Sequence, residues 1–261
     1  MARVLEVCVD SVESAEQAAR GGAMRLELCA DLIVGGTSPD EDLFCMVRER
    51  VGLPIRVLLR PRFGDFLYSD EEYELLRRQV RRFRALGADG VVIGILRPDG
   101  TLDETRMAGL IELAGGMGVT LHRAFDVCRD PFAALETARK LGVDTILTSG
   151  QQASCVEGAA LLHELVKAAD GRPQILIGAG VNAQVIRTLQ PQTGADAFHL
   201  SAKRTLGSGM VFRRAGVPMG LPGISEFSLW RCDADAVREA RDALDALCGE
   251  TGGKACRFKK C

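Results

Sequence analysis

Short runs rich in β-branched residues and leucine alternate along the chain with longer amphipathic segments that carry most of the charge. Eight such runs predict β-strands. They lie about 27 residues apart on average, which is room for a strand, a helix and two short loops. This alternation predicts a parallel sheet with helical connections. The predicted strands are 4–10, 25–29, 55–60, 90–95, 119–125, 144–149, 174–180 and 196–202.

A second pattern recurs before every other strand: a glycine that ends a helix, a small residue, and then the strand. It occurs at 21–28, 86–94, 141–150 and 193–202, as a barrel built from four similar quarters would show. The first predicted strand–helix turn, VCVDSVESAEQ, lacks the glycine-rich fingerprint of an open nucleotide-binding sheet. The chain length of 261 residues also suits a barrel. We therefore expect one α/β fold, a (β/α)8 TIM-type barrel, and no nucleotide cofactor.

Helix starts are marked by Ser38-Pro39 with Glu41, by Ser69 with Glu72, and by Asp130-Pro131. Each places a capping residue before a glutamate or a first-turn proline. After the eighth strand, a long loop at 203–230 is rich in glycine and proline, and we expect it to cover the barrel or contact another subunit. A final helix is predicted at 233–247. The barrel domain is thus expected to span 1–248, followed by a flexible tail at 249–261.

Charge and cysteine content exclude several classes of protein. The 33 Lys and Arg residues nearly balance the 35 Asp and Glu residues, so no broad cationic surface is expected to bind nucleic acid or a membrane. The N-terminal segment contains Glu6 and Asp10 where a secretion signal stays apolar, and no apolar run is long enough to span a bilayer. Nine scattered cysteines without a CxxC pair indicate reduced thiols. We expect a cytoplasmic protein.

One face of several predicted strands is polar where a barrel interior is normally packed with apolar side chains. Charged side chains turned toward the surrounding helices would cost several kcal/mol each unless paired. Placement inside the barrel, near the carboxyl ends of the strands, costs less and is where barrel enzymes keep their sites. These faces carry Glu6, Cys8 and Asp10; Glu27 and Cys29; Arg56, Arg60 and Arg62; His122 and Asp126; and His199 and Ser201.

Because adjacent strands lie side by side, we expect Glu6 next to Glu27 and Cys8 next to Cys29. A nearby arginine or metal ion would keep both carboxylates ionised, and without one the pKa of one carboxyl would rise and create a general acid. A purely structural ionic network with Arg60 is the alternative. The candidate catalytic residues are Glu6, Glu27, His122 and His199.

Other polar groups near the predicted strand ends suit an anion. Arg60 and Arg62 could clamp a carboxylate or phosphate, or pair internally with Asp65 and Asp126. The segment GAGVNAQ at 178–184 could bind phosphate through its backbone, or its glycines could serve tight packing. No GxSxG or HExxH motif supports another mechanism. The candidate substrate-binding residues are Arg60, Arg62, Asp126, Ser149, Gly178, Gly180 and Ser201.

Several long motifs occur in order along the chain: EVCVDS, RLELCADLIVGGTSP, LLRPRFGDFLYS, GADGVVIGIL, LHRAFD, ILTSG and FHLSA. Taken together, they are similar to the CutC family of copper homeostasis proteins. The resemblance covers residues 4 to about 214, and it implies a cytoplasmic TIM barrel that forms homo-oligomers and handles copper, with Cu(I) as the ligand. In that family the cysteines of the first two motifs are the suggested copper ligands, and they match Cys8 and Cys29 here; thiolates select Cu(I).

Three functions remain open from the sequence. The first is Cu(I) binding by Cys8 and Cys29. The second is an enzyme, a lyase, isomerase or hydrolase, that uses acid–base chemistry on a small anionic molecule. The polar pocket of Glu, Arg and His suits such a molecule better than copper. The third is an interaction scaffold built on the 203–230 loop.

Overall fold

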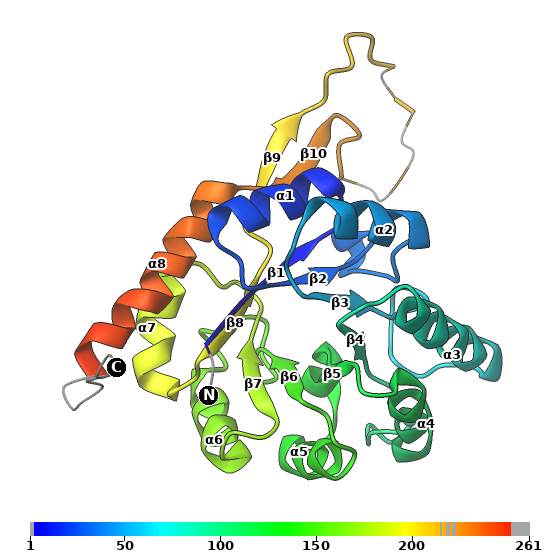
Figure 1. Cartoon of the computed structure of the whole chain (residues 1–261), viewed down its shortest axis with the longest axis vertical. Helices are drawn as coiled ribbons and strands as arrows, with labels where there is room; N and C mark the ends of the chain where they lie inside the picture. The colour runs from blue at the N-terminus through cyan, green and yellow to red at the C-terminus, as the bar shows by residue number, and fades with distance from the viewer. Residues whose placement is uncertain (1–2, 215, 218–219, 221–222, 252–261) are drawn as a thin grey trace, which may run out of the picture.

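Eight parallel strands close into a barrel that helices surround on the outside (Figure 1). The computed structural model describes residues 3–214, 216–217, 220 and 223–251. The strands pair in chain order, and β8 pairs back to β1, which confirms the TIM-type barrel. All eight predicted strands are present, and each ends before the predicted residue. They are β1 Val4–Val9, β2 Arg25–Leu28, β3 Ile55–Leu58, β4 Gly90–Ile93, β5 Gly118–Leu121, β6 Thr145–Thr148, β7 Gln174–Ile177 and β8 Ala197–Leu200.

The helices bury the outward side chains of the strands, so the main apolar core lies between the barrel and the helical layer. Leu5 and Val7 of β1, for example, are completely buried in this core. No helix in the described part of the chain is long and apolar enough to cross a bilayer. The α-helices are α1 Val12–Gly21, α2 Glu41–Arg50, α3 Asp70–Ala85, α4 Glu104–Ala114, α5 Pro131–Lys140, α6 Ala159–Ala169, α7 Ala183–Thr193 and α8 Ala234–Thr251, and two short 3-10 helices are η1 Leu32–Val34 and η2 Arg123–Val127.

Two of the three predicted helix starts are confirmed. Ser69 and Glu72 form a reciprocal capping box at α3, and Asp130 caps α5 with Pro131 in the first turn. The prediction for α2 was wrong, because Asp40 caps that helix. Ser38 instead accepts a hydrogen bond from the backbone N–H of Arg60 and so ties the α2 entry to the end of β3.

The repeated glycine before alternate strands has the predicted role. Gly22 ends α1 and Gly194 ends α7, both with left-handed backbone conformations, at φ of 90° and 74°. A side chain is strained in that conformation, so glycine is favoured at these turns. The turns then lead directly into β2 and β8.

The segment after β8 differs from the predicted long loop. It forms an antiparallel pair, β9 Lys203–Gly207 and β10 Ser228–Cys232, which projects from the barrel beside α1 (Figure 1). The pair is anchored to the barrel because the Cys232 N–H donates to Ser14 Oγ at 3.1 Å. The sequence pattern missed these strands because they are mostly exposed and show no buried apolar run.

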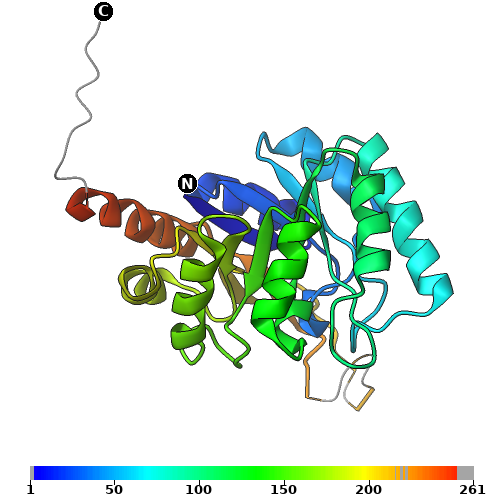
Figure 2. The same cartoon turned by 90° about the horizontal axis from the view of Figure 1, so that it is seen from below.

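The C-terminal helix α8 packs beside α7 and α1 at one side of the barrel (Figure 2). It continues to Thr251, three residues beyond the expected domain boundary at 248. The rest of the expected tail, with Cys256 and Cys261, lies outside the described residues.

Candidate functional site

The register between β1 and β2 sets the charge pairing inside the barrel. Glu6 lies opposite Arg25, and Cys8 lies opposite Glu27. The backbone register therefore pairs neither Glu6 with Glu27 nor Cys8 with Cys29. The side chains are nevertheless neighbours, as expected, because ligand atoms of Glu6 and Glu27 lie within 4.8 Å of each other and the two cysteines share one buried cluster. Closing a barrel requires neighbouring strands to be staggered, and the stagger brings an arginine to the buried carboxylate.

Glu6 is completely buried and has two charged partners. Arg25 Nε donates to Glu6 Oε2 at 2.5 Å, and His199 Nδ1 lies 2.8 Å from Glu6 Oε1. Burial alone would raise the pKa of Glu6, but Arg25 and His199 outweigh it and lower the pKa to about 2. Glu6 is therefore an ionised carboxylate at neutral pH.

His199 connects Glu6 to Glu27. Its Nε2 lies 3.4 Å from Glu27 Oε2, on the opposite side of the ring from Glu6. Burial lowers the pKa of His199, but the Cys8 sulfur and the two carboxylates act against it, so the net pKa lies well above 6.5. His199 is thus an imidazolium held between two glutamates.

Glu27 titrates differently from Glu6. Burial raises its pKa, the His199 cation opposes the rise, and Glu6 adds to it, which leaves the pKa at about 7. Glu27 also lines a cavity. At neutral pH this carboxyl group can either give or accept a proton, which is what general acid–base catalysis requires.

The ligand atoms of Glu6, Glu27 and His199 all lie within 4.8 Å of one another, a spacing that could hold a metal ion. The set contains no sulfur. Carboxylate and imidazole donors suit a harder divalent ion better than Cu(I). Both oxygens of Glu6 already accept hydrogen bonds, one from Arg25 and one from His199, so an ion would have to displace these partners.

A second polar layer crosses the barrel interior. Arg56 of β3 donates to Thr120 of β5 and to Thr145 of β6, the latter at 3.2 Å. Burial lowers the pKa of Arg56, and Arg25 adds to the effect. Both hydroxyl groups accept from Nη1 of Arg56, so this side chain links β3 to β5 and β6 across the interior.

A cavity of about 310 Å³ opens at the carboxyl end of the barrel. Its strand residues include Cys8, Glu27 and His199, and its wall beyond the strand ends includes Arg60 and His122. The antiparallel pair β9–β10 contributes to the same lining, so the segment at 203–230 does cover part of the barrel, as the sequence allowed. The lining residues from this pair are Lys203, Trp230, Arg231 and Cys232.

His122 is 3% exposed, and its Nδ1 accepts the N–H of Ala124 at 3.2 Å. The ring proton therefore lies on Nε2, which has no hydrogen-bond partner within the described ranges. Burial, assisted by the charge of Arg60, lowers the pKa of His122 to about 3. His122 is a neutral donor beside the cavity, and the Phe66 ring lies against it with centroids 4.8 Å apart.

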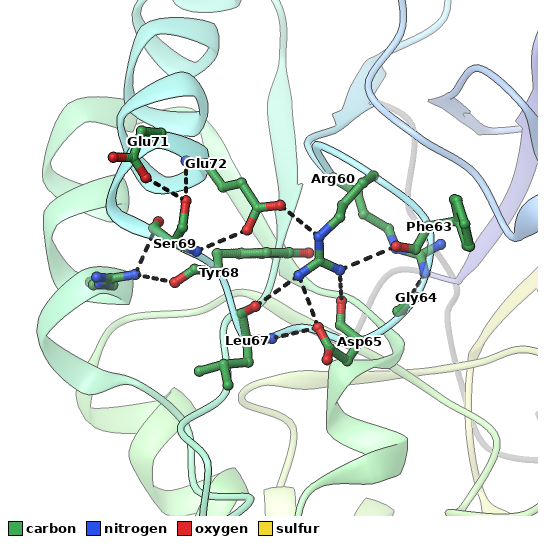
Figure 3. Close-up of polar contacts among 11 residues, drawn as sticks. Arg60, Phe63, Gly64, Asp65, Leu67, Tyr68, Ser69, Glu71 and Glu72 are labelled. Atoms are coloured by element: carbon green, nitrogen blue, oxygen red, sulfur yellow. Dashed lines mark hydrogen bonds and ion pairs between the residues drawn. The ribbon is translucent and has the colours of Figure 1, made fainter.

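Arg60 is not paired with any carboxylate of the described chain. Its terminal nitrogens donate to the backbone carbonyls of Val34, Gly36 and Gly64, which fixes the loops after β2 and β3. Figure 3 shows Arg60 beside Gly64 in the second of these loops. Its Nε is buried and has no partner among these residues. Arg60 lines the cavity, but most of its donors hold protein backbone.

Arg62 does not join the cavity. It pairs with Asp65 at 3.0 Å and with Glu72 at 2.6 Å, two residues of the β3–α3 connection and of α3. Pairing with Asp65 is the internal alternative that the sequence left open. The structure therefore places Arg62 outside the cavity lining, apart from Arg60.

Asp126 and Ser149 also lie outside the cavity lining. The alternation that grouped Asp126 with His122 stops because β5 ends at Leu121 and η2 begins at Arg123. Asp126 accepts the backbone N–H and the hydroxyl of Ser149, each at 3.0 Å, and the Nε of Arg123 at 2.7 Å. These two residues support Arg123, which does line the cavity.

Only some of the candidate binding residues in the loops after β7 and β8 line the cavity. Gly180 and Ser201 line the cavity, whereas Gly178 does not. A Cβ atom at Gly178 would lie 2.6 Å from Leu147 Cδ1, so a side chain here would have to move the end of Leu147. Packing is the alternative that the sequence left open for Gly178.

Cys8 and Cys29 both line the cavity and pack in one apolar cluster with Leu58 and Val92. Burial raises the pKa of the Cys29 thiol well above 9, and Glu27 adds to the rise. A ligand that binds Cys29 as a thiolate must therefore displace a firmly held proton. The six cysteines whose side chains the structure describes are free thiols.

Sequence reasoning missed Arg25, Arg123 and the β9–β10 lining residues. Arg25 precedes Glu27 by two positions, so strand alternation alone places it on the same face and could have found it. Arg123 lies beyond the end of β5, where alternation no longer applies. The β9–β10 residues carry no pattern that assigns them to the cavity.

Comparison with known proteins decides the family. The CutC family model matches residues 3–204. The chain therefore belongs to the CutC family. A CutC family protein of Chromobacterium violaceum is 44% identical over 245 residues, covering 94% of this chain and 99% of that protein. The copper homeostasis protein cutC homolog of Mus musculus is 44% identical over 246 residues, covering 92% and 90%.

A crystal structure from the same family agrees with the fold. The putative copper homeostasis protein CutC of Streptococcus agalactiae superposes with a TM-score of 0.72 at 28% identity, covering 76% of this chain and 98% of that one. The barrel and its position in the CutC family thus rest on sequence and structure together.

Proposed function

We propose that the cavity is the active site of an enzyme that performs acid–base chemistry on a small anionic molecule, with Glu27 as the group that gives and accepts the proton. The observation that carries this proposal is the position of Glu27, buried at the cavity and held by the His199 imidazolium at 3.4 Å. An ionic network that only stabilised the barrel would have no need of a cavity beside it. A lyase, isomerase or hydrolase step uses such a group.

The partners of Glu27 have distinct roles in this scheme. Glu6 stays ionised and keeps His199 protonated through the 2.8 Å contact at Nδ1. His199 then stabilises the ionised form of Glu27 after it has given up its proton. His122 is neutral, so its Nε2–H can donate to an oxygen of the substrate on which negative charge develops.

The experiment is a conversion screen in D2O. The protein is incubated with a set of small phosphorylated and carboxylated metabolites and followed by proton NMR, which detects both product and exchange of carbon-bound hydrogen. We expect at least one compound to change with the wild type and to stay unchanged with Glu27→Gln. The matched control is Glu49→Gln, because Glu49 is exposed at the end of α2.

Two results contradict this function. One is that no compound of either chemical class changes in the presence of the wild-type protein. The other is that the Glu27→Gln variant, shown to be folded by circular dichroism, converts a compound as fast as the wild type does.

A second function is favoured by a separate observation: the two thiols of Cys8 and Cys29 line the same cavity and share one apolar cluster. Soft thiolate ligands select Cu(I), and the relative from Mus musculus is named a copper homeostasis protein. In this case Cu(I) is the cargo, and its binding releases the thiol protons.

Copper binding is tested by titration with Cu(I) under anaerobic conditions. The Cys8→Ser, Cys29→Ser double variant is expected to lose Cu(I) uptake, whereas Cys45→Ser, on α2 and outside the cavity lining, is expected to retain it. Uptake that is unchanged in the double variant would rule out these ligands.

A further inference from the structure

The cavity contains more positive than negative side chains. Four cations and two acids are found among its Lys, Arg, Asp and Glu residues, and one of the acids, Glu27, faces the His199 imidazolium. A cavity with this surplus attracts an anionic guest. The six residues are Arg60, Arg123, Lys203, Arg231, Asp10 and Glu27.

Three of the four cations are engaged with the protein itself. The terminal nitrogens of Arg60 hold backbone carbonyls. Lys203 Nζ lies 3.6 Å from the centre of the Trp230 ring, and Arg231 Nη1 donates to the Trp230 carbonyl. These contacts leave the positive charge of the three side chains in place, and none of the three is ion-paired with a carboxylate of the described residues.

Arg123 is arranged differently. Its Nε donates to Asp126 Oδ2 at 2.7 Å, and its Nη2 donates to Ser149 Oγ at 2.9 Å. Asp126 is itself fixed, because its side chain is 6% exposed and it accepts the Ser149 backbone N–H. The Arg123 side chain is 44% exposed, and its Nη1 makes no hydrogen bond to any described residue.

A guanidinium with one edge held by the protein and its other donors exposed is typical of an arginine that binds an anionic ligand. A guanidinium that is held along one edge loses little conformational entropy when its remaining donors meet a ligand. The neighbouring residue in the chain, His122, adds a buried Nε2–H without a partner in the wall of the same cavity. A buried donor left unpaired is costly, and an oxygen of a ligand would satisfy it.

We propose that Arg123 binds the anionic group of the molecule that occupies the cavity, a carboxylate or a phosphate, and that Asp126 and Ser149 hold its guanidinium in position. This inference rests on the proposed function and assigns the residue that binds the anionic group of its substrate. It also gives Asp126 and Ser149, which lie outside the lining, a positioning role behind a residue that lies in it.

The test is isothermal titration calorimetry at constant ionic strength with three probes: inorganic phosphate, succinate and glycerol. We expect the wild type to bind phosphate or succinate at millimolar concentrations and not to bind glycerol. Arg123→Gln should lower the affinity for the anion by about tenfold or more. Arg123→Lys should lower this affinity less, because the positive charge remains although the paired N–H donors of the guanidinium are lost. Arg129→Gln is the matched control, since Arg129 is exposed and outside the lining.

Binding of phosphate but not succinate assigns a phosphate ligand, and the reverse assigns a carboxylate. The proposal is wrong if neither anion binds the wild type, or if both Arg123 variants bind as the wild type does. If Arg123→Gln does not fold, Arg123→Lys and Ser149→Ala decide the question. Each of these variants should bind the same anion with lower affinity than the wild type, and neither should bind glycerol.

Glu27→Gln separates this inference from the proposed function. Anion binding that persists in that variant while turnover is lost supports both. Anion binding that persists with turnover unchanged supports the Arg123 site and contradicts the acid–base role of Glu27.

Discussion

His199 Nδ1 lies 2.8 Å from Glu6 Oε1, across the pairing of β8 with β1 that closes the barrel. The seam of the barrel is therefore also the place where its buried charges are joined. The same ring reaches Glu27 through its other nitrogen. This contact links the closure of the fold to the protonation state of the cavity.

Removing the charge of Glu6 should destabilise the protein strongly. Glu6→Gln leaves Arg25 and the His199 imidazolium without their shared carboxylate in a fully buried place. Breaking a buried pair in this way costs about 3–5 kcal/mol. Urea denaturation measures the loss, and the exposed Glu49→Gln variant should change stability by less than about 0.5 kcal/mol. Equal stabilities of the two variants would show that Glu6 is not energetically coupled to its neighbours.

The stability of Glu27→Gln relative to the wild type should depend on pH. Because folding raises the pKa of Glu27 from 4.5 to about 7, the folded state holds the proton more tightly, and the wild type loses stability as pH rises through this range. Glutamine has no such loss. The variant should gain up to about 3 kcal/mol relative to the wild type between pH 5 and pH 8.

Urea denaturation of both proteins at the two pH values measures this change. Glu49→Gln should show no comparable change relative to the wild type, since Glu49 is exposed. A stability difference between Glu27→Gln and the wild type that is the same at acidic and alkaline pH would mean that folding leaves the affinity of Glu27 for its proton unchanged.

The two cavity histidines should differ in protonation. With a pKa of about 3, His122 should remain neutral with its proton on Nε2 down to mildly acidic pH, whereas His199, with its pKa well above 6.5, should carry both ring protons at pH 7. Nitrogen-15 chemical shifts of the imidazole rings report this directly, and His122→Asn and His199→Asn assign the signals. A doubly protonated His122 at pH 7 would exclude its role as a neutral donor.

Much of the fold could be predicted because the spacing of apolar residues and the helix-capping residues are local properties of the sequence. The eight strands and the caps at Ser69 and Asp130 follow from neighbouring residues. The β9–β10 pair could not be predicted, since its residues are largely exposed and lack an apolar alternation.

The candidate site was predictable only where alternation within a strand defines it. Glu6 and Glu27 were correctly assigned to polar faces, but their pairing depends on the stagger between strands, which no single segment encodes. Asp126 and Arg123 lie past the end of β5, where the chain turns into η2 and the period of two is lost. The position of Arg123 at the cavity is therefore a tertiary property.

Proton exchange by Glu27 near neutral pH can be followed by carbon-13 NMR of the protein labelled at the glutamate side-chain carboxyl. A pH titration of the wild type and of Glu27→Gln identifies the signal. We expect one carboxyl resonance that titrates near pH 7 and is missing from the variant. If the resonance removed by Glu27→Gln instead titrates at the ordinary glutamate value of 4.5, Glu27 is not the acid–base group of the cavity.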